Sequence, residues 1–505
     1  MKKTFNLGSV PDIVDFAEIA YGYVKVSVPP GALKLVAQRR KRLEALLASG
    51  DVMYGINTGF GELASQRVSD ENLKALQVNL IRSHACGVGE PLDDAEVRGL
   101  MFARVNELAM GNSGVRPLLI TKLAEFINKD VIPFIPSKGS VGASGDLAPS
   151  AHMALVLIGE GRARLAGEEK WRPSAAVLKQ ARIKPIELAE KEGLALINGT
   201  QAMKSVGGLA LFEAMHLFSS AVLTGAMSLE ALKGTPAAFD RRIHALKPHH
   251  GQVAVAAMLL DMLRGSQIRA SHRSADKRVQ DPYSLRCMPQ AMGAVRDTLV
   301  HALSVFETEF ASVTDNPLVV EAAGAKGAIE VISGGNFHGQ AVAFAADFAA
   351  VALTALGNIS ERRIAQLVSD FKILPPFLAR NPGLESGFMI AHVTAAALCN
   401  ENKILSHPAS ADSISTSANK EDFVSMGMNA ALKLSTVVRN VARITAIEMI
   451  AAAEGVEFHR PLKSSRRLEE ALAALRKLSP AFKGDEVFSD RIEIVAEAIL
   501  SGYFA

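Results

Sequence analysis

The stretch that decides the interpretation of this chain is Gly139-Ser140-Val141-Gly142-Ala143-Ser144-Gly145-Asp146-Leu147-Ala148-Pro149. At its centre, a small residue and a glycine flank a serine hydroxyl. Glycine adopts backbone conformations that are closed to other residues, so Gly145 permits a bend tight enough to bring its amide nitrogen to the carbonyl carbon of Ala143. The sequence therefore allows an electrophile to be built from backbone atoms alone.

Ring closure with loss of one water, followed by loss of a second water from the Ser144 side chain, leaves a methylene group conjugated to the ring. The product is 4-methylidene-imidazol-5-one (MIO), which requires no metal or nucleotide. Asp146 follows directly and can assist the proton transfers. An Ala-Ser-Gly tripeptide is also a common turn, so the interpretation depends on the rest of the chain.

Composition favours a large helical protein. The chain has 505 residues, of which 49% are hydrophobic and 6% aromatic, and alanine occurs in long runs. Alanine is the strongest helix former, so close-packed helices are favoured over sheets. The net charge of +3 is small for this length and argues against nucleic acid or an acidic membrane as a partner.

Cysteine usage and the N-terminus favour a cytoplasmic protein. Cys86, Cys287 and Cys399 have no C-x-x-C spacing, which disfavours a disulfide framework or a zinc site. No apolar signal segment follows the two N-terminal lysines. The apolar stretch 341–357 contains Asp347 and fits a buried helix better than a membrane span.

We expect a mostly α fold in three parts. Residues 1–200 form a mixed, mainly helical domain that carries the Ala-Ser-Gly loop, 201–455 a long-helix bundle, and 456–505 a C-terminal helical region. Helical periodicity runs through 202–232, 252–264, 291–310, 340–367, 388–405 and 429–454. Several of these stretches are apolar on all sides, so they must be covered by other helices of the same or another subunit.

Polar, glycine-rich islands interrupt these apolar stretches, and each can line a pocket. They contain Tyr54, His84, Asn198, the group Gln280, Tyr283 and Arg286, the pair Asn336 and Phe337, and Glu421. From residue type alone, ordinary explanations remain open: a packed tyrosine, a structural histidine, an Asn-Gly turn or a surface ion pair. An arginine can also grip a carboxylate through two parallel hydrogen bonds, as binding an amino acid requires.

Together these islands and the Ala-Ser-Gly string resemble the aromatic amino acid lyases, which include the histidine, phenylalanine and tyrosine ammonia-lyases. The resemblance spans nearly the whole chain. It implies that Ala143, Ser144 and Gly145 form MIO, that an amino acid is the substrate, and that a homotetramer shares its active sites between subunits. The substrate amine would add to the methylidene carbon, which makes the nitrogen a better leaving group.

The same resemblance assigns roles to individual residues. Tyr54 is the base that removes the β-proton, although a phenol with a free pKa of about 10 must be made more acidic for this task. Tyr283 is a second mechanistic tyrosine, and Asn198 and Arg286 hold the substrate carboxylate. The residues that support the ring are Asp146, Gln280, Asn336 and Phe337.

Substrate choice points to histidine. His84 is followed by a small residue, as in the histidine lyases, and Glu421 stands where phenylalanine and tyrosine lyases carry glutamine. Both would bind an imidazole, Met389 matches a pocket-lining position, and the product would be trans-urocanate.

Departures from the usual pattern leave other substrates open. Gln340, Glu385, Lys420 and Phe423 replace the usual Glu, Asn, Gln and His. The alternatives are a lyase or 2,3-aminomutase acting on tyrosine, phenylalanine or a modified histidine, and an inactive helical scaffold with an uncyclised loop. A fumarase-type lyase is disfavoured because its Gly-Ser-Ser-x-Met-Pro-type loop is missing.

The first prediction concerns the electrophile. Ser144→Ala removes the hydroxyl that must leave as water, so activity should be abolished while the fold stays intact. Amino acid turnover and circular dichroism of the purified variant check both halves. Full activity in this variant would refute the MIO hypothesis.

Overall fold

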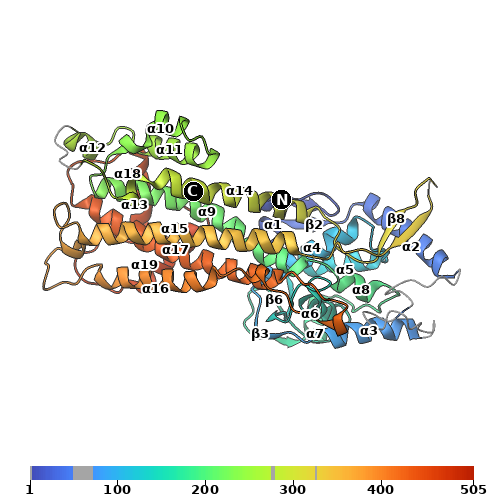
Figure 1. Ribbon diagram of the computed structural model, residues 1–505. Helices are drawn as coiled ribbons and strands as arrows, with labels where there is room; N and C mark the ends of the chain where they lie inside the picture. The colour runs from blue at the N-terminus through green and yellow to red at the C-terminus, as the bar shows by residue number, and fades with distance from the viewer. Residues whose placement is uncertain (1–2, 49–57, 59–71, 274–278, 325–326) are drawn as a thin grey trace. The chain divides into compact units, whose positions relative to one another are not determined.

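The computed structural model describes residues 3–48, 58, 72–273, 279–324 and 327–505, and the chain is mostly helical (Figure 1). The predicted mostly α fold is confirmed. The chain divides into two compact units. The first unit comprises residues 1–209, 303–346 and 408–432, and the second comprises 210–302, 347–407 and 433–505. The sequence-based division at residues 200 and 455 stays a prediction.

The first unit holds the short strands and most of the short helices. In chain order these are β1 (Thr4–Asn6), α1 (Ile13–Ala20), β2 (Lys25–Ser27), α2 (Pro30–Ala48), α3 (Leu73–His84), β3 (Val88–Pro91), α4 (Asp94–Ala109), α5 (Pro117–Asn128), β4 (Val131–Pro133), β5 (Pro136–Lys138), α6 (Leu147–Leu157), β6 (Arg162–Leu165), β7 (Arg172–Pro173), α7 (Ser174–Ala181), α8 (Glu192–Ile197), β8 (Leu318–Glu321), β9 (Ile329–Ile332), η5 (Ala409–Ala411) and η6 (Ser417–Asn419).

The long helices α9 (Gln201–Ala231), α14 (Met288–Phe310), α15 (Gln340–Ser369) and α17 (Gly427–Glu457) contribute residues to both units. The other elements of the second unit are η3 (Pro236–Phe239), α10 (Arg241–Ala245), α11 (His250–Met262), α12 (Gln267–His272), α13 (Tyr283–Arg286), η4 (Pro376–Leu378), α16 (Met389–Leu405), α18 (Arg466–Leu478) and α19 (Ser489–Leu500). Each helix expected from periodicity is present, with ends that differ by a few residues.

The strands form small separate sheets rather than one core sheet. β1 and β2 are parallel, whereas β3–β5, β4–β6–β7 and β8–β9 are antiparallel. The β3–β5 pair matters for the site, because β5 ends at Lys138 and α6 begins at Leu147. The Ala-Ser-Gly loop is therefore held between a paired strand and a helix.

Capping residues mark the N-termini of two helices of the first unit. The Asp12 carboxylate accepts the Asp15 amide hydrogen at 2.8 Å and caps α1. Asp93 and Glu96 form a capping box at the start of α4. Such caps satisfy amide groups that have no partner within the helix.

In the core of the first unit, two glycines of α9 pack directly against aromatic rings. A Cβ placed on Gly207 would lie 2.6 Å from the Phe306 ring, and one on Gly208 would lie 2.6 Å from the Phe310 ring. Phe310 also stacks on Phe16, with ring centroids 4.3 Å apart. The two glycines thus let α9 approach α14 closely, as dense interior packing requires.

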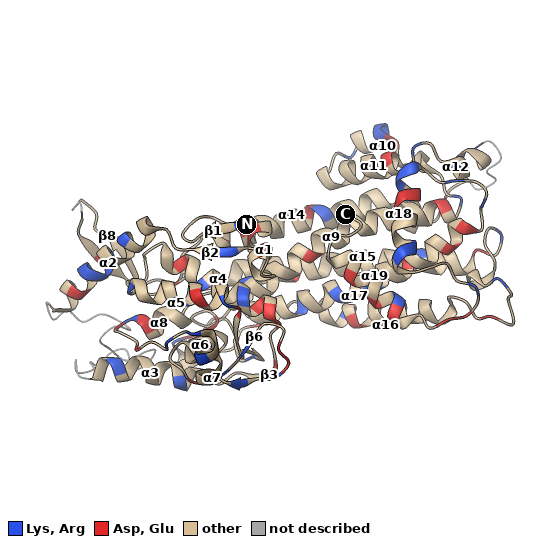
Figure 2. Cartoon of the chain, turned by 180° about the vertical axis from the view of Figure 1, so that it is seen from behind, with Lys and Arg blue, Asp and Glu red and all other residues tan. Residues whose placement is uncertain are grey.

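Close helix contacts also build the second unit. A Cβ on Gly225 of α9 would lie 2.6 Å from the Met288 sulfur of α14, and one on Gly357 of α15 would lie 3.2 Å from Val441 of α17. Figures 1 and 2 show the parts of α9, α14, α15 and α17 that belong to this unit running alongside one another. Residues that are apolar on most sides of a helix are buried by such neighbours.

Two of these helices, α9 and α15, are long and apolar enough to cross a membrane by length and composition alone. Most of the apolar window of each lies buried inside the protein. A core helix shows the same property, so this is weak evidence for a membrane span.

A buried ion pair fixes the centre of the second unit. Glu448 accepts two hydrogen bonds from Arg363, at 2.5 and 2.8 Å, and one each from Ser228 and Ser360. Arg363 and Glu448 are fully buried. Removing one partner from a buried pair leaves the other charge without compensation.

The second prediction follows from this pair. Glu448→Gln should lower the free energy of unfolding by about 3–5 kcal/mol, because it leaves the Arg363 guanidinium buried without an opposite charge. Urea unfolding measures the change. The exposed Arg443–Glu493 pair provides the control, because Arg443→Gln should cost about 1 kcal/mol or less. Equal losses in the two variants would contradict the assignment.

Candidate active site

The Ala-Ser-Gly loop has a left-handed backbone. Gly142, Ser144 and Gly145 have φ angles of +76°, +48° and +80°. A side chain in this region is strained, by roughly 1–2 kcal/mol for an ordinary residue. Ser144 therefore persists in this conformation only because neighbouring segments hold the loop.

One of those segments is the start of α9. The Gly199 amide donates to the Ser144 carbonyl at 3.2 Å, and the Asp146 amide donates to the Gly199 carbonyl at 2.7 Å. A Cβ on Gly145 would come within 2.1 Å of the Gly199 oxygen. Only glycine fits at position 145, and the loop is pressed against residue 199.

The segment 425–427 closes the other side of the loop. The Met426 amide donates to the Val141 carbonyl at 2.9 Å. A Cβ on Gly142 would lie 2.2 Å from the Ser425 hydroxyl oxygen. The loop is thus confined between two segments that are distant in sequence.

Asp146 anchors the loop to the first turn of α9. Its carboxylate is fully buried and accepts from the Ser140 hydroxyl at 2.8 Å and from the Met203 amide at 2.7 Å. Burial raises the pKa of Asp146 to about 6, and the hydrogen bonds from Met203 and Ser140 partly oppose the shift. A carboxylate at a helix N-terminus also stabilises the helix dipole.

The Ser144 hydroxyl points at Glu421. It donates to one Glu421 carboxylate oxygen at 3.0 Å. The other oxygen accepts from the Thr416 and Ser417 hydroxyls at 2.8 and 2.7 Å. Glu421 is therefore fixed with one oxygen aimed at the residue that would lose water.

His84 ends α3 with one ring nitrogen engaged. Its Nδ1 lies 2.8 Å from the Leu80 carbonyl oxygen, which can only accept, so this nitrogen carries the hydrogen. Burial lowers the pKa of His84, while the Leu80 hydrogen bond and the charge of Glu421 oppose the shift. Among the described residues only Nδ1 of this imidazole is engaged, which leaves Nε2 to accept from a ligand.

Asn198 is buried, and its side-chain oxygen has no partner among the described residues. A buried acceptor without a donor is costly, which is expected where a ligand completes the bond. Asn336 is exposed and donates to the Val313 carbonyl at 3.2 Å, and Phe337 is half-buried beside it.

The residues that depart from the usual pattern differ in what they do. The Glu385 carboxylate accepts from the Arg380 and Asn381 amides at 2.9 and 3.2 Å, so it closes a turn. Phe423 stacks on His338 with ring centroids 5.7 Å apart. Both amide atoms of Gln340 are buried without a partner among the described residues.

The remaining predicted site residues lie elsewhere. Tyr54 falls outside the described residues. In the second unit, Tyr283 is 70% exposed and the Arg286 guanidinium carbon lies 4.4 Å from its ring centre. Gln280 is exposed, and Met389 begins α16 with 38% exposure. The first unit thus brings together Ser144, Asp146, Asn198 and Glu421, and the second pairs Tyr283 with Arg286.

Sequence reasoning missed a buried polar cluster behind the loop. It consists of Arg104, Glu107, Gln201 and Thr314, each at most 1% exposed. A signal was present, since Arg104 and Glu107 interrupt the apolar stretch of α4 at a spacing of three residues. A charged pair on an otherwise buried helix indicates a partner that only tertiary structure supplies.

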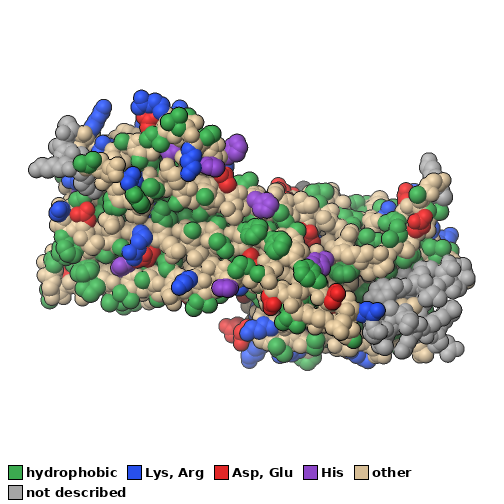
Figure 3. All heavy atoms as spheres, viewed as in Figure 1, with side chains coloured by type: hydrophobic (Ala, Val, Ile, Leu, Met, Phe, Trp, Pro, Cys, Tyr) green, Lys and Arg blue, Asp and Glu red, His purple; other side chains and the backbone are tan. Residues whose placement is uncertain are grey.

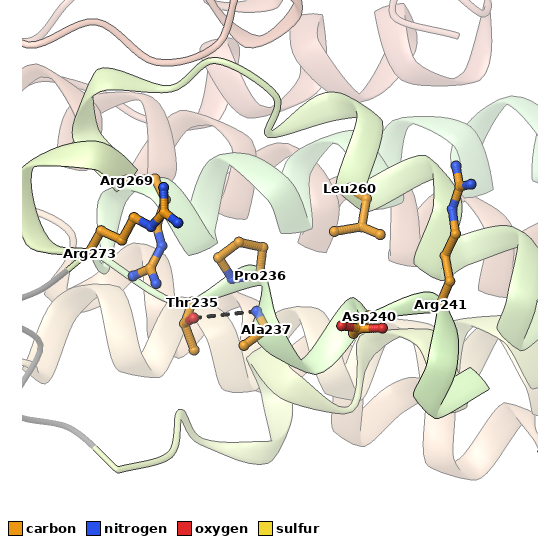
Figure 4. A pocket seen from close by; sticks show the side chains of 8 residues that line it. All are labelled: Thr235, Pro236, Ala237, Asp240, Arg241, Leu260, Arg269 and Arg273. Carbon is orange, nitrogen blue, oxygen red and sulfur yellow. Dashed lines mark hydrogen bonds between the residues drawn. The ribbon is translucent and has the colours of Figure 1, made fainter. Parts of the chain in front are cut away.

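One pocket of the second unit does not coincide with these residues (Figure 4). Its volume is about 560 Å³, and the side chains that line it are Thr235, Pro236, Ala237, Asp240, Arg241, Leu260, Arg269 and Arg273. None of the predicted site residues lines it. Within the described part of the chain, no group of three or more His, Cys, Asp or Glu side chains is arranged to hold a metal ion.

The loop, its buried carboxylate and its serine–glutamate contact form the candidate active site, and comparison with known proteins identifies the class of enzyme as a lyase. The sequence profile of the aromatic amino acid lyases matches residues 12–477. The chain belongs to the aromatic amino acid lyase family.

Individual relatives are similar over their full length. The chain is 49% identical to a histidine ammonia-lyase of Koribacter versatilis, covering 100% of this chain and 99% of the relative. The structure of a histidine ammonia-lyase from Trypanosoma cruzi matches with a TM-score of 0.91 and 40% identity, covering 99% and 94% of the two chains. A tyrosine aminomutase from Streptomyces globisporus matches with a TM-score of 0.92 and 36% identity, covering 99% and 97%.

The third prediction concerns Asp146. Its folded-state pKa of about 6 lies above the ordinary value of 3.8, so the folded protein binds this proton more tightly than the unfolded chain. The resulting stabilisation is complete below pH 3.8 and is lost as pH rises through about 6, a change of roughly 3 kcal/mol. Asp146→Asn should remove this decline.

Urea unfolding of both proteins between pH 4 and pH 7 measures the effect. Relative to the unaltered protein, the free energy of unfolding of Asp146→Asn should be higher at pH 7 than at pH 4. A difference that does not vary with pH would contradict the assignment.

Proposed function

We propose that this protein is an MIO-dependent ammonia-lyase that eliminates ammonia from L-histidine to give trans-urocanate. The observation that carries the proposal is the loop pressed between residues 199 and 425–427, with the Ser144 hydroxyl 3.0 Å from Glu421. The similarity to histidine ammonia-lyases over the full length supports the choice of substrate.

The residues present fit the ring. Gly145 occupies a cradle that a Cβ would fill, and the buried oxygen of Asn198 has no partner among the described residues. The ring, once formed, supplies an electrophile for the substrate amine. Ala143, Ser144 and Gly145 would form it, with Asp146, Gln280, Asn336 and Phe337 as supporting residues.

The other side chains would bind and orient the substrate. Arg286 suits a carboxylate because its planar group donates two parallel hydrogen bonds. His84 and Glu421 would bind the imidazole, His84 accepting through Nε2. Loss of the Ser144 hydroxyl as water would release the Glu421 oxygen that it now engages.

Proton removal falls to the tyrosines. Tyr54 is the proposed base for the β-proton and Tyr283 the second mechanistic tyrosine. The Arg286 guanidinium carbon lies 4.4 Å from the Tyr283 ring centre, and this cation–π contact holds the two side chains together. Met389 is proposed to line the substrate pocket.

A second candidate function is a lyase or 2,3-aminomutase that acts on tyrosine, phenylalanine or a modified histidine. The similarity to a tyrosine aminomutase favours keeping it, as does Phe423 two residues from Glu421. The phenol hydroxyl of a tyrosine substrate, like the imidazole of a histidine substrate, both donates and accepts hydrogen bonds, so His84 can bind either group.

We propose a homotetramer with shared active sites, located in the cytoplasm. Apolar side chains remain exposed on long helices of the second unit: Phe348 and Val351 on α15, and Ile390 and Val393 on α16. Hydrophobic side chains are also spread over the face in Figure 3. Exposed apolar faces of this kind mark contacts between subunits. The three free cysteines suit a reducing compartment.

The experiment that tests the proposal is incubation of the purified protein with L-histidine, L-tyrosine or L-phenylalanine in turn. Ultraviolet absorbance follows the conjugated acid product, and Ser144→Ala is the control. A Ser144-dependent rise with histidine alone is expected. A rise with tyrosine or phenylalanine would favour the second candidate, and product analysis would distinguish lyase from aminomutase.

The fourth prediction tests the imidazole-binding role of Glu421. Glu421→Gln keeps the shape of the side chain and removes its charge, so histidine turnover should fall more than any residual tyrosine turnover. A lost charged hydrogen bond costs about 1.5–3 kcal/mol, roughly a 10- to 100-fold fall in kcat/KM for histidine. An equal effect on both substrates would refute the assignment.

A further inference from the structure

The cluster formed by Arg104, Glu107, Gln201 and Thr314, here termed the Arg104 cluster, lies entirely within the first unit. Arg104 comes from α4 and donates to the Asn198 carbonyl at 2.6 Å and to the Gln201 side-chain oxygen. These acceptors belong to the residue before Gly199 and to the first residue of α9. Arg104 thus grips the chain on both sides of Gly199.

The rest of the cluster completes this grip. The Gln201 amide donates to Glu107 at 2.5 Å and to the Thr314 hydroxyl oxygen at 3.0 Å. The Thr314 hydroxyl donates to Glu107 at 2.9 Å. A Cβ on Gly199 would lie 2.5 Å from the Thr314 hydroxyl oxygen, so Thr314 packs closely against Gly199 on this side.

Gly199 is the residue against which the Ala-Ser-Gly loop is pressed. The Gly199 carbonyl accepts a hydrogen bond from the Asp146 amide, and the Gly199 amide donates one to the Ser144 carbonyl. The Gly199 oxygen also occupies the space that a Cβ on Gly145 would need. Any shift of Gly199 would therefore loosen the bend at Ser144 and Gly145. Arg104 donates to the carbonyl of Asn198, the residue that precedes Gly199.

Stability alone does not explain a guanidinium in this position. Burial lowers the pKa of Arg104, and the charges of Glu107, Asp315 and Asp146 oppose that shift. Buried ion pairs are often no more stabilising than well-packed apolar residues of similar volume. Both hydrogen bonds leave from Nη2, whose two hydrogens lie in the plane of the guanidinium, so this group holds the two acceptors in a defined geometry. Nε and Nη1 have no hydrogen-bond partner among the described residues.

We propose that Arg104 is a positioning residue for ring formation, because it holds the segment 198–201 against the loop. This inference rests on the proposed function. In ring closure the Gly145 nitrogen bonds the Ala143 carbonyl carbon, and the carbonyl oxygen leaves as water with the amide hydrogens of Ser144 and Gly145. The second water takes the Ser144 hydroxyl and its Cα hydrogen, so no oxidant or reductant is required.

The test compares Arg104→Lys with Arg363→Lys. Lysine keeps the charge, but its ammonium rotates on a flexible stem, so it lacks the fixed, planar N–H directions with which Nη2 holds both acceptors. Arg363 is an equally buried arginine of the second unit, paired with Glu448, and its replacement controls for general destabilisation. Each protein is isolated in folded form by size exclusion, and intact mass gives the fraction of chains short of two waters.

The unaltered protein and Arg363→Lys should lack two waters. Folded Arg104→Lys isolated at the same time should show a lower matured fraction, because loss of one charge-assisted hydrogen bond slows maturation about 10-fold or more. Full maturation of Arg104→Lys overturns the inference and leaves the proposed function standing. Equal losses in Arg104→Lys and Arg363→Lys also overturn it. An unaltered protein that retains both waters overturns the proposed function and the inference together.

If Arg104→Lys does not fold, Thr314→Val decides the question with the same readout. This change removes only the hydroxyl that holds Gln201 and lies against Gly199. Thr354→Val in the second unit is its matched control, because the Thr354 hydroxyl donates to the Ala350 carbonyl within its own helix. A lower matured fraction in Thr314→Val than in Thr354→Val supports the inference, and equal fractions overturn it.

Discussion

Two glycines from distant parts of the chain meet where Gly145 abuts the carbonyl of Gly199, and the rest of the site is arranged around that contact. Neither position has space for a side chain. The hydrogen bonds from Asp146 to Gly199 and from Gly199 to Ser144 hold the two segments together. These contacts hold the Ala-Ser-Gly loop in its left-handed bend, and such preorganisation favours the proposed reaction of the loop with itself.

The fold around this contact supplies rigidity from three directions. The start of α9 provides Gly199 and the amide of Met203, to which Asp146 is tied. The segment before α17 closes the loop through Met426. Behind α9, the Arg104 cluster of the first unit fixes the chain where α9 begins. Sites supported by regular elements are held more accurately than sites on free loops, and these contacts give the Ala-Ser-Gly loop such support.

Sequence reasoning identified the Ala-Ser-Gly loop and the long helices because both have local signatures. The Ala-Ser-Gly string is specific, and the helices from α9 to α17 show a strong apolar period. It also noted Asn198 and Glu421, whose surroundings support the proposed roles. It could not find Arg104 or the compression at Gly199, because both depend on contacts between residues that lie about 50 to 210 positions apart in the sequence. Tyr54 falls outside the described residues, so its role stays a prediction.

The most direct test of the central claim is the intact mass of the purified, unaltered protein, with the position of any deficit mapped by proteolysis. The account predicts a mass lower than that of the sequence by two waters, with the deficit confined to the peptide that contains Ala143, Ser144 and Gly145. A mass equal to that of the sequence would contradict it. In that case the compressed loop would be an unusual turn, and the chemistry built on it would have to be abandoned.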